Sequence, residues 1–561
     1  MTAIGDISSA TMTTGPSGAG YDNFDTKALI EAKLQPRRSR ISRLNDEVKV
    51  NSAKISAYSN LRSKLSALGR TATALRAAPD SGGRGGDVFR AREAKLATSS
   101  GARAETYLSA SVRNDTALNS HSISVSKVAK ANILSSAVRS SQNDALGWSG
   151  SFTLGAGTAP NVTVTVSVDM SLTEVAEAIN AETGVTKIAA SVMKVADNQY
   201  RLILTATETG KTIRLADTAG NSLLADASKF GLIDNSGNVK AENVLQAAQN
   251  AEFTVDGVSL IRSGNDVDDV LLGVTLRIYN PTPDREVLTL KVNHNLNTIK
   301  TAVTSFVESY NALRDIVISG QATKPDGSAD GNATLFGDVN LRAVAAIQNI
   351  LSSSVDGRGL GELGIKFDAD NKLTINDGLL NKALLNDLDA VETLFSYRAA
   401  ISSGDLTLLR HPNSSFTFEL NVTVDADGKV TGADVDGDTS TFSVSGSAII
   451  GKPGTAYEGL ALLYTGRTSK TISVKLSQGV ADRMHYVADK FADADNGILS
   501  GLISSLSKTN GDVDKRIQAL EASTKGYAQY LSTLYGRMAN RISQAQTTIK
   551  LFQAFLKSGL D

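Results

Sequence analysis

Apolar residues near the N-terminus recur at the alternating three- and four-residue spacing of a coiled-coil seam. This spacing places them on one face of an α-helix, and the residues between them are mostly polar. The pattern therefore predicts a long amphipathic helix whose apolar face needs a partner. The seam positions are Ile41, Leu44, Val48, Asn51, Ile55 and Tyr58.

A longer seam of the same kind occupies the C-terminal end, where no proline occurs between Val513 and Leu556. At a rise of 1.5 Å per residue this helix would be about 65 Å long. Two long seams at opposite termini favour one paired helical stalk over two helices of a globular bundle. The assembly residues expected in this second seam are Leu520, Tyr527, Leu531, Leu534, Met538, Ile542, Ile549 and Phe552.

Some seam positions hold polar or small residues instead of large apolar ones. Asn51, Thr524 and Ala545 are examples. A polar residue in a seam can fix the register at a cost in stability, and it also suits weak, reversible packing. The pattern alone is compatible with both explanations.

Between the two ends the pattern changes to alternation of apolar and polar residues, which is typical of β-strands. Short amphipathic helices interrupt the strands. The fold class predicted is α+β, discontinuous and multidomain, with N- and C-terminal helices pairing as coiled-coil legs and a strand-rich head inserted between them. The clearest strands are expected at 122–126, 162–168, 201–205, 252–255, 274–278, 416–420 and 472–476, and the clearest helices at 172–182, 298–316 and 341–351.

Length and composition narrow the classes of protein that remain. A chain of 561 residues should form several domains, because a single core seldom exceeds about 250–300 residues. It contains no cysteine, which excludes disulfides, thiolate metal sites and cysteine nucleophiles. We expect no membrane contact, since no apolar run is long enough to span a bilayer and residues 1–20 lack the features of a cleaved signal peptide.

The net charge of −1 is unevenly distributed along the chain. Residues 33–76 carry eleven basic against two acidic residues, a net of +9, and residues 508–557 carry eight against three, a net of +5. Basic ends raise the possibility of nucleic-acid binding. The charges flank an apolar seam and lack interleaved aromatic residues, so solvated helix flanks or an acidic protein partner are favoured, and no nucleic acid is expected.

No constellation of catalytic or metal-binding residues is recognisable. The four histidines lie in different segments without shared spacing. Two Asp-rich turns, at 368–372 and 425–429, open like calcium loops, but the second has Asp436 where a bidentate glutamate is expected. Both are predicted to be hairpin turns. We expect no catalytic residue, no cofactor and no metal, and hence a protein that is not an enzyme.

A series of short blocks, in a fixed order, resembles one known family. The most specific block is 253–258 with Asn265 and 270–276, and further blocks lie at 25–34, 97–131, 306–313, 335–338, 363–368, 391–395, 535–542 and 549–552. Their succession over nearly the whole chain resembles the flagellar filament-capping proteins, also called hook-associated protein 2. Residues 162–215 are also similar to a repeat found in flagellins.

The resemblance departs from the family pattern in two places. The Gly-rich start is altered at 18–22, and 396–478 looks like an added strand-rich insert. The layout implied by the resemblance is a flexible, export-competent N-terminus (1–24), an N-terminal coiled-coil leg (25–80), an inner head domain (91–135 and 244–296), an outer head domain with the flagellin-type repeat (136–243), a helical leg-proximal domain (297–395), the insert (396–478) and a C-terminal coiled-coil leg (479–561).

The resemblance also implies a function. Identical subunits would form a ring, usually a pentamer, at the distal end of the flagellar filament, where exported flagellin folds beneath the heads and is inserted. The implied partners are other copies of the chain, flagellin and the filament tip, hook-associated junction proteins and a dedicated export chaperone. The protein would be extracellular and exported without a cleaved signal peptide. The alternatives are another flagellar axial or junction protein, a surface adhesin whose head binds host glycans or mucus, and a secreted enzyme.

Overall fold

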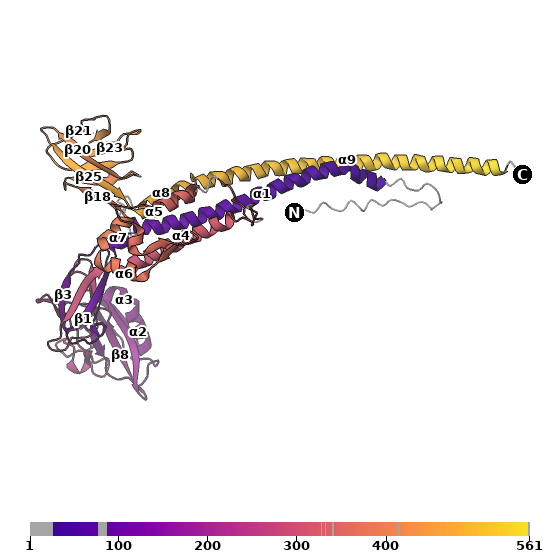
Figure 1. Ribbon diagram of the computed structural model, residues 1–561. Coiled ribbons are helices and arrows are strands. Elements are labelled where there is room, and N and C mark those ends of the chain that lie inside the picture. The colour runs from indigo at the N-terminus through magenta and orange to yellow at the C-terminus, as the bar shows by residue number, and fades with distance from the viewer. Residues whose placement is uncertain are drawn as a thin grey trace.

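A long helical stem joins two strand-rich parts that lie on opposite sides of one of its ends (Figure 1). The computed structural model describes residues 26–76, 87–326, 328–330, 333–338, 342–412 and 414–558. The expected export segment at 1–24 and the Gly-rich stretch at 82–86 lie outside these residues. The α+β class, with terminal helices flanking a strand-rich head, is confirmed.

The stem consists of α1 (Thr26–Leu75) and α9 (Ile498–Ser558), which pair antiparallel. The pairing is visible in the contacts between them, since Arg37 reaches Ser523 and Asn51 reaches Asn510. Helix α1 continues through Pro36, which has no N–H and so leaves one carbonyl of the preceding turn without its helical hydrogen bond. Because α9 is longer, it extends well beyond the start of α1 (Figure 1).

The largest hydrophobic core lies at the root of the stem, where the second half of α1 packs on α4, α8 and the first turns of α9, and α5 packs on α8. We call this region the root bundle. Leu61, Leu65 and Phe306 are fully buried in its core. Its remaining elements are η3 (Val88–Arg90), α4 (Leu296–Gly320), α5 (Arg342–Ser352), η7 (Leu360–Leu363), β16 (Ile365–Phe367), β17 (Leu373–Ile375), α6 (Asp377–Asn386), α7 (Leu388–Phe395) and α8 (Val480–Ala492).

The inner head contains two antiparallel sheets around a core of alternating apolar residues such as Phe253 and Leu290. One sheet has the strand order β1-β15-β3-β11-β12 and the other β13-β14-β2. The strands are β1 (Arg92–Thr98), β2 (Leu108–Val112), β3 (Ser120–Lys127), β11 (Ala251–Val255), β12 (Val258–Arg262), β13 (Asp266–Val267), β14 (Val274–Ile278) and β15 (Leu288–His294), with η4 at Ala104–Thr106.

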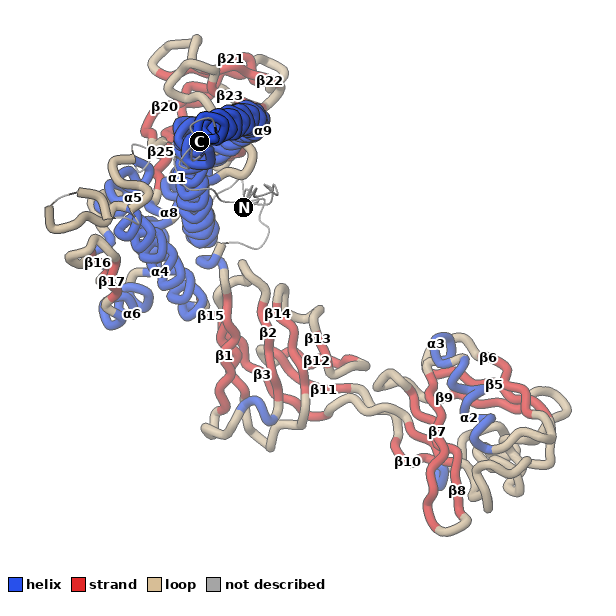
Figure 2. Tube along the Cα trace, turned by 90° about the vertical axis from the view of Figure 1, so that its right-hand side faces the viewer, coloured by secondary structure: helices blue, strands red, loops and turns tan. Residues whose placement is uncertain are grey.

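The outer head is inserted into the inner head and lies at its far end (Figure 2). The outer head has two sheets, with the strand orders β10-β4-β8-β7 and β6-β5-β9, and helix α2 covers them. A capping box between Ser171 and Glu174 fixes the start of α2. The elements are β4 (Ile133–Ser135), β5 (Gly150–Ala156), β6 (Val162–Val166), α2 (Leu172–Ala181), α3 (Thr183–Thr186), β7 (Ile188–Ala196), β8 (Gln199–Ala206), β9 (Ile213–Asp217), η5 (Ala241–Asn243) and β10 (Val244–Gln246).

The segment between α7 and α8 folds into a separate two-sheet unit, which we call the insert. Its sheets have the orders β18-β25-β20-β21 and β19-β24-β23-β22, and they enclose a core of their own. The strands are β18 (Tyr397–Ile401), β19 (Leu406–Arg410), β20 (Phe416–Val424), β21 (Val430–Val435), β22 (Phe442–Ser445), β23 (Ala448–Gly451), β24 (Ala461–Tyr464) and β25 (Lys470–Gln478).

Both Asp-rich turns are hairpin turns, as predicted. The Asp425 side chain accepts hydrogen bonds from the backbone N–H groups of Asp427 and Lys429 where β20 turns into β21. Asp368 does the same for Asp370 and Lys372 between β16 and β17. One oxygen of each carboxylate therefore stabilises its own turn.

Candidate assembly surface of the stem

The two terminal seams meet over part of their length in the stem. Ile41 and Leu44 of α1 pack against Val513 and Ile517 of α9, and Val48 and Leu520 are partly buried against this cluster. A second cluster lies nearer the start of α1 and contains Leu34, Ala528 and Leu531, with Tyr527 packed against it. The face of each helix that its spacing predicts is therefore the face that the partner helix covers here.

Asn51 lies at a polar break in the paired seam. Its side-chain amide donates a hydrogen bond of 3.0 Å to the side-chain oxygen of Asn510, and the Asn510 amide donates one of 3.2 Å to Ser52. A shift of one helix past the other would separate these groups and leave partly buried amides unsatisfied. This geometry favours register control as the role of Asn51, which remains a proposal.

Replacing both amides by leucine (Asn51→Leu with Asn510→Leu) is expected to stabilise the stem locally by about 1–2 kcal/mol, because an apolar pair replaces a polar one. Amide exchange in α1 around residues 41–51 measures this change as slower local opening. Asn60→Leu on the exposed side of the same helix is the matched control and should leave exchange unchanged. Faster exchange in the double variant would contradict the proposed role.

The last residues of the predicted N-terminal seam lie where the paired helices α1 and α9 enter the root bundle. Ile55 is half-buried, and Tyr58 is buried in the root bundle, where its hydroxyl donates a hydrogen bond to Asp338. The seam therefore gains partners along α1: its first part faces α9, and from Tyr58 onward it packs on the other helices of the root bundle as well as on the first turns of α9.

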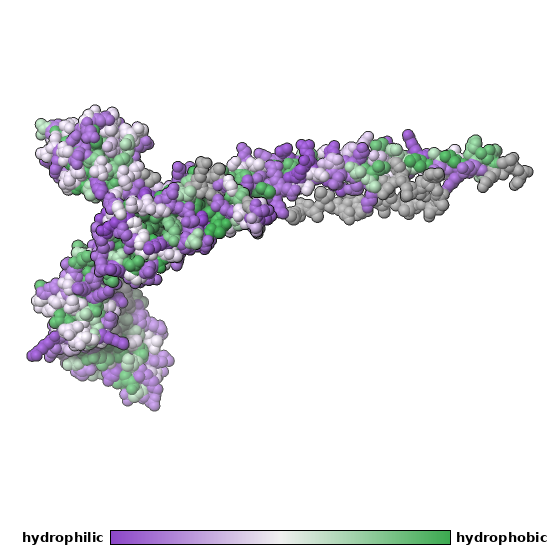
Figure 3. Space-filling model, viewed as in Figure 1, coloured by the Kyte–Doolittle hydropathy of each residue, from purple (hydrophilic) through white to green (hydrophobic). Residues whose placement is uncertain are grey.

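The predicted C-terminal seam continues past the start of α1 and is then exposed. Leu534 is 38% exposed, and exposure rises to 56% at Ile549 and 69% at Phe552. We call this surface the distal stripe, and hydrophobic side chains are visible along this part of α9 (Figure 3). It comprises Leu534, Met538, Ile542, Ile549, Phe552 and Leu556. In the single chain these residues lie on a helix face that α1 does not cover.

The charged residues beside the distal stripe are all basic. From residue 532 to 558 the sequence contains Arg537, Arg541, Lys550 and Lys557, and no aspartate or glutamate. The stripe therefore combines an apolar face with basic flanks. Such a helix suits a partner that offers a complementary apolar groove with acidic residues at its edges.

Several residues that contribute to the stem were not expected from the sequence. Leu34 precedes Ile41 by one heptad, but the predicted seam began at Ile41. Ala528 and Tyr535 lie beside seam positions and help to cover Leu34 and Ile30. An extension of the heptad count by one repeat across the proline would have found Leu34.

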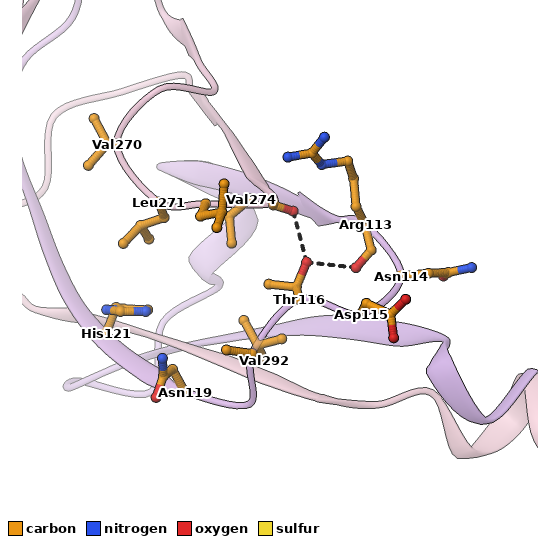
Figure 4. Close-up of a pocket in the computed structure, with 13 residues that line it drawn as sticks. Arg113, Asn114, Asp115, Thr116, Asn119, His121, Val270, Leu271, Val274 and Val292 are labelled. Carbon is orange, nitrogen blue, oxygen red and sulfur yellow. Dashed lines mark hydrogen bonds between the residues drawn. The ribbon is translucent and has the colours of Figure 1, made fainter. Parts of the chain in front are cut away.

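A shallow pocket of about 490 Å³ opens in the inner head (Figure 4). Val274 and Val292 are among its apolar lining residues, and the Thr116 hydroxyl donates to the carbonyl of Arg113 at 2.7 Å and also contacts the carbonyl of Gly273. His121 pairs with Asp256 through a contact of 2.7 Å, a hydrogen bond that keeps the pKa of this carboxyl below its ordinary value. Because the hydroxyl is directed at backbone carbonyls, it does not form a nucleophile–base pair with the histidine.

The described residues offer neither a metal site nor a membrane span. Within the ranges described above, no group of three or more histidine or carboxylate side chains is placed to hold a metal ion. Among the described helices, none is long and apolar enough to cross a membrane.

A stem of paired terminal helices, carrying discontinuous strand-rich heads and an uncovered apolar stripe, defines an elongated structural protein. Family models for the N-terminus and the C-terminus of flagellar hook-associated protein 2 match residues 22–132 and 248–547, and a flagellin hook IN motif matches residues 151–208. The chain belongs to the flagellar hook-associated protein 2 family. The family comprises structural cap proteins of the flagellum, so the chain is not an enzyme.

Individual relatives have moderate identity to the chain. The flagellar hook-associated protein 2 of Salmonella typhimurium is 32% identical over 40% of this chain and 49% of its own length. The A-type protein of Pseudomonas aeruginosa is 25% identical over 72% of this chain and 82% of its own length. A crystal structure of the D1-D2-D3 domains of the flagellar cap protein FliD from Escherichia coli has 27% identity and a TM-score of 0.45, covering 61% of this chain and 90% of that one.

The family match bears on the predictions made from sequence. The resemblance to the filament-capping family is confirmed, and the match does not favour an adhesin or another axial protein. The flagellin-type repeat expected at 162–215 overlaps the matched motif at 151–208.

Proposed function

We propose that the chain forms a ring of identical subunits, a pentamer, at the distal end of the flagellar filament. In this arrangement the stems point towards the filament and the heads form a plate above it. The ring retains exported flagellin, promotes its folding and its insertion beneath the plate, and prevents its loss to the medium. The protein reaches the cell exterior through the flagellar export route without a cleaved signal peptide, accompanied before export by a dedicated chaperone, and meets the hook-associated junction proteins before the filament grows.

The observation that carries this proposal is the distal stripe. A helix with exposed Ile549 and Phe552 is poorly stabilised by its own residues, since long helices owe most of their stability to packing. A neighbouring stem or the filament end would cover the stripe, and its basic flanks suit an acidic neighbour. The distal stripe could leave one partner and bind the next without any catalytic group. This fits a cap that advances as subunits are added.

Deletion of the gene is expected to leave cells with hooks, few or no filaments and flagellin monomers in the medium. Electron microscopy of the cell surface and immunoblots of culture supernatants measure the two effects. Complementation with the full chain should restore filaments and clear the supernatant. Normal filaments in the deletion strain would refute the capping function.

A further inference from the structure

The insert is attached to the root bundle by two chain segments that run side by side. Tyr397, the first residue of β18, pairs with Gln478, the last residue of β25. Just outside this pair, the N–H of Gly479 donates to the carbonyl of Ser396 at 2.8 Å. A side chain at Gly479 would collide with the backbone of Phe395. The insert is therefore joined to the root bundle without a flexible linker.

Buried charged and polar residues hold this attachment in place. The Arg76 guanidinium donates from Nε to Asp482 at 3.0 Å, and Gln478 donates to the other carboxylate oxygen at 2.8 Å. His411 lies 3.8 Å from Asp482 and stacks on Tyr397, whose backbone N–H donates to the Arg76 carbonyl. We call Arg76, Asp482, Gln478 and His411 the root clasp. All four are at most 5% exposed.

The root clasp joins three elements of different origin. Arg76 follows the last residue of α1, Asp482 lies in the first turn of α8, and Gln478 and His411 come from the insert. An ion pair removed from water in this way is strongly destabilising to break, because an unpaired charge would remain buried. The direction of the insert is therefore tied to the ends of two helices.

Helices α1 and α8 also contact each other away from the root clasp, at positions about one helical turn apart. Gly69 of α1 faces Ala488 of α8 so closely that an added Cβ would lie 2.9 Å from the Ala488 Cβ. One turn further along α1, the Thr73 hydroxyl lies 3.1 Å from Nδ1 of His485. The third step is Arg76 with Asp482. These three contacts, which we call the α1–α8 ladder, fix how far α1 can slide or tilt against α8.

Two polar groups near the ladder lack partners. The Tyr397 hydroxyl, and Nε and Nη2 of Arg483 on α8, are buried without a hydrogen bond in the described part of the chain. Burial raises the pKa of the Tyr397 hydroxyl and lowers the pKa of the Arg483 guanidinium. Unsatisfied buried groups of this kind are uncommon in native structures.

The outer head is attached in a different way. Its two connecting segments pair through Lys130 and Gln249 and through Asn132 and Gln246, hydrogen bonds that join neutral backbone and amide groups. Within the described part of the chain, these two segments are not joined by a buried ion pair like Arg76–Asp482. The attachment of the insert therefore depends on the position of a stem helix through a buried ion pair, whereas the attachment of the outer head does not.

We propose that the α1–α8 ladder and the root clasp couple the direction of the insert to the position of α1 in the stem. Movement of α1 against α8 is passed through Arg76 and Asp482 to β18 and β25. A change in packing along the stem is thereby converted into a change in the direction of a separate domain on the other side of the root bundle. The coupling is a property of the single chain and does not depend on the proposed function.

Distances between spin labels test the coupling, and the absence of native cysteine allows labels to be placed freely. One label at exposed Ser445 on the insert and one at exposed Thr301 on α4 report the direction of the insert. The parent chain should give one narrow distance distribution. The double variant Arg76→Gln with Asp482→Asn, which removes both charges and leaves a polar amide at each position, should broaden it about twofold or more. An unchanged distribution in a folded double variant overturns the proposal.

The exposed ion pair between Lys475 of the insert and Asp356 of the root bundle provides the matched control. Lys475→Gln with Asp356→Asn also removes one positive and one negative charge across the same junction. Because exposed pairs contribute little, the distribution should stay as narrow as in the parent chain. Equal broadening in both double variants overturns the assignment of the coupling to the root clasp.

Gly69→Ala tests the coupling without touching a charge, and it remains informative if the clasp variant fails to fold. The added methyl should separate α1 from α8 by about 1 Å, the difference between its present clearance and ordinary contact. Labels at exposed Ser63 and Lys490 measure this separation. We expect the Ser445–Thr301 mean distance to shift with it. A changed separation of the helices with no change at the insert overturns the proposal.

Discussion

Aspartate at two positions of the distal stripe, Ile549→Asp with Phe552→Asp, should abolish capping and leave the subunit folded. Both side chains are exposed in the single chain, so the substitutions should change its unfolding free energy by no more than about 0.5 kcal/mol. In the assembled cap the same charges would lie at a contact that should be apolar, where burial of an unpaired carboxylate is costly. Filament counts and flagellin in the supernatant of complemented deletion cells measure the loss.

The matched control places two aspartates on the opposite face of the same helix. Ser543→Asp with Thr547→Asp adds the same charge in the preceding turns, but away from the stripe. Filaments should grow normally with this variant. If both variants lose filaments equally, the effect is one of charge on α9, and the stripe has no special role. If neither does, the stripe is not an assembly surface.

The root bundle should be the part of the chain most sensitive to a cavity. Phe306 is fully buried in its core and its ring meets that of Phe395 edge-on at a centroid distance of 6.0 Å. Phe306→Ala is therefore expected to destabilise the bundle by about 3–5 kcal/mol. Amide exchange in α4 and α8 should accelerate, whereas exchange in the insert core should be unaffected because the two cores are separate.

Leu385→Ala supplies the control for this cavity, since that side chain is 72% exposed on α6 of the same bundle. Its effect should stay within about 0.5 kcal/mol. A loss in Phe306→Ala no larger than in Leu385→Ala would contradict the placement of Phe306 at the centre of the core.

The heptad spacing could predict which face of each terminal helix is apolar, but not how far the partner helix reaches. Ile41 and Ile549 hold equivalent positions in their seams, yet the first is buried and the second is exposed. The difference arises because α9 extends past the first residue of α1, and lengths of two distant helices are independent in the sequence. Spacing is a local property, whereas cover depends on the partner.

The root clasp could not be found from the sequence for a related reason. Arg76 and Asp482 are 406 positions apart, and neither stands in a motif. Their pairing depends on how the insert and the inner head leave the bundle. Strands were easier to predict, because the alternation of apolar and polar residues at 416–420 and 472–476 is a property of each segment alone. These segments lie in the paired strands β20 and β25.

The antiparallel pairing of α1 with α9 also sets the order in which the chain can fold. Asn51 and Asn510 are 459 positions apart, so the stem closes only after both heads and the insert have been supplied by the chain between them. Each of these parts has its own core and forms largely from contacts within itself. Contacts between distant segments form late, because closing a long loop costs entropy before it gives any stability. A folding subunit should therefore pass through a state with finished heads and two unpaired terminal helices, each free to meet a neighbour before it meets the other.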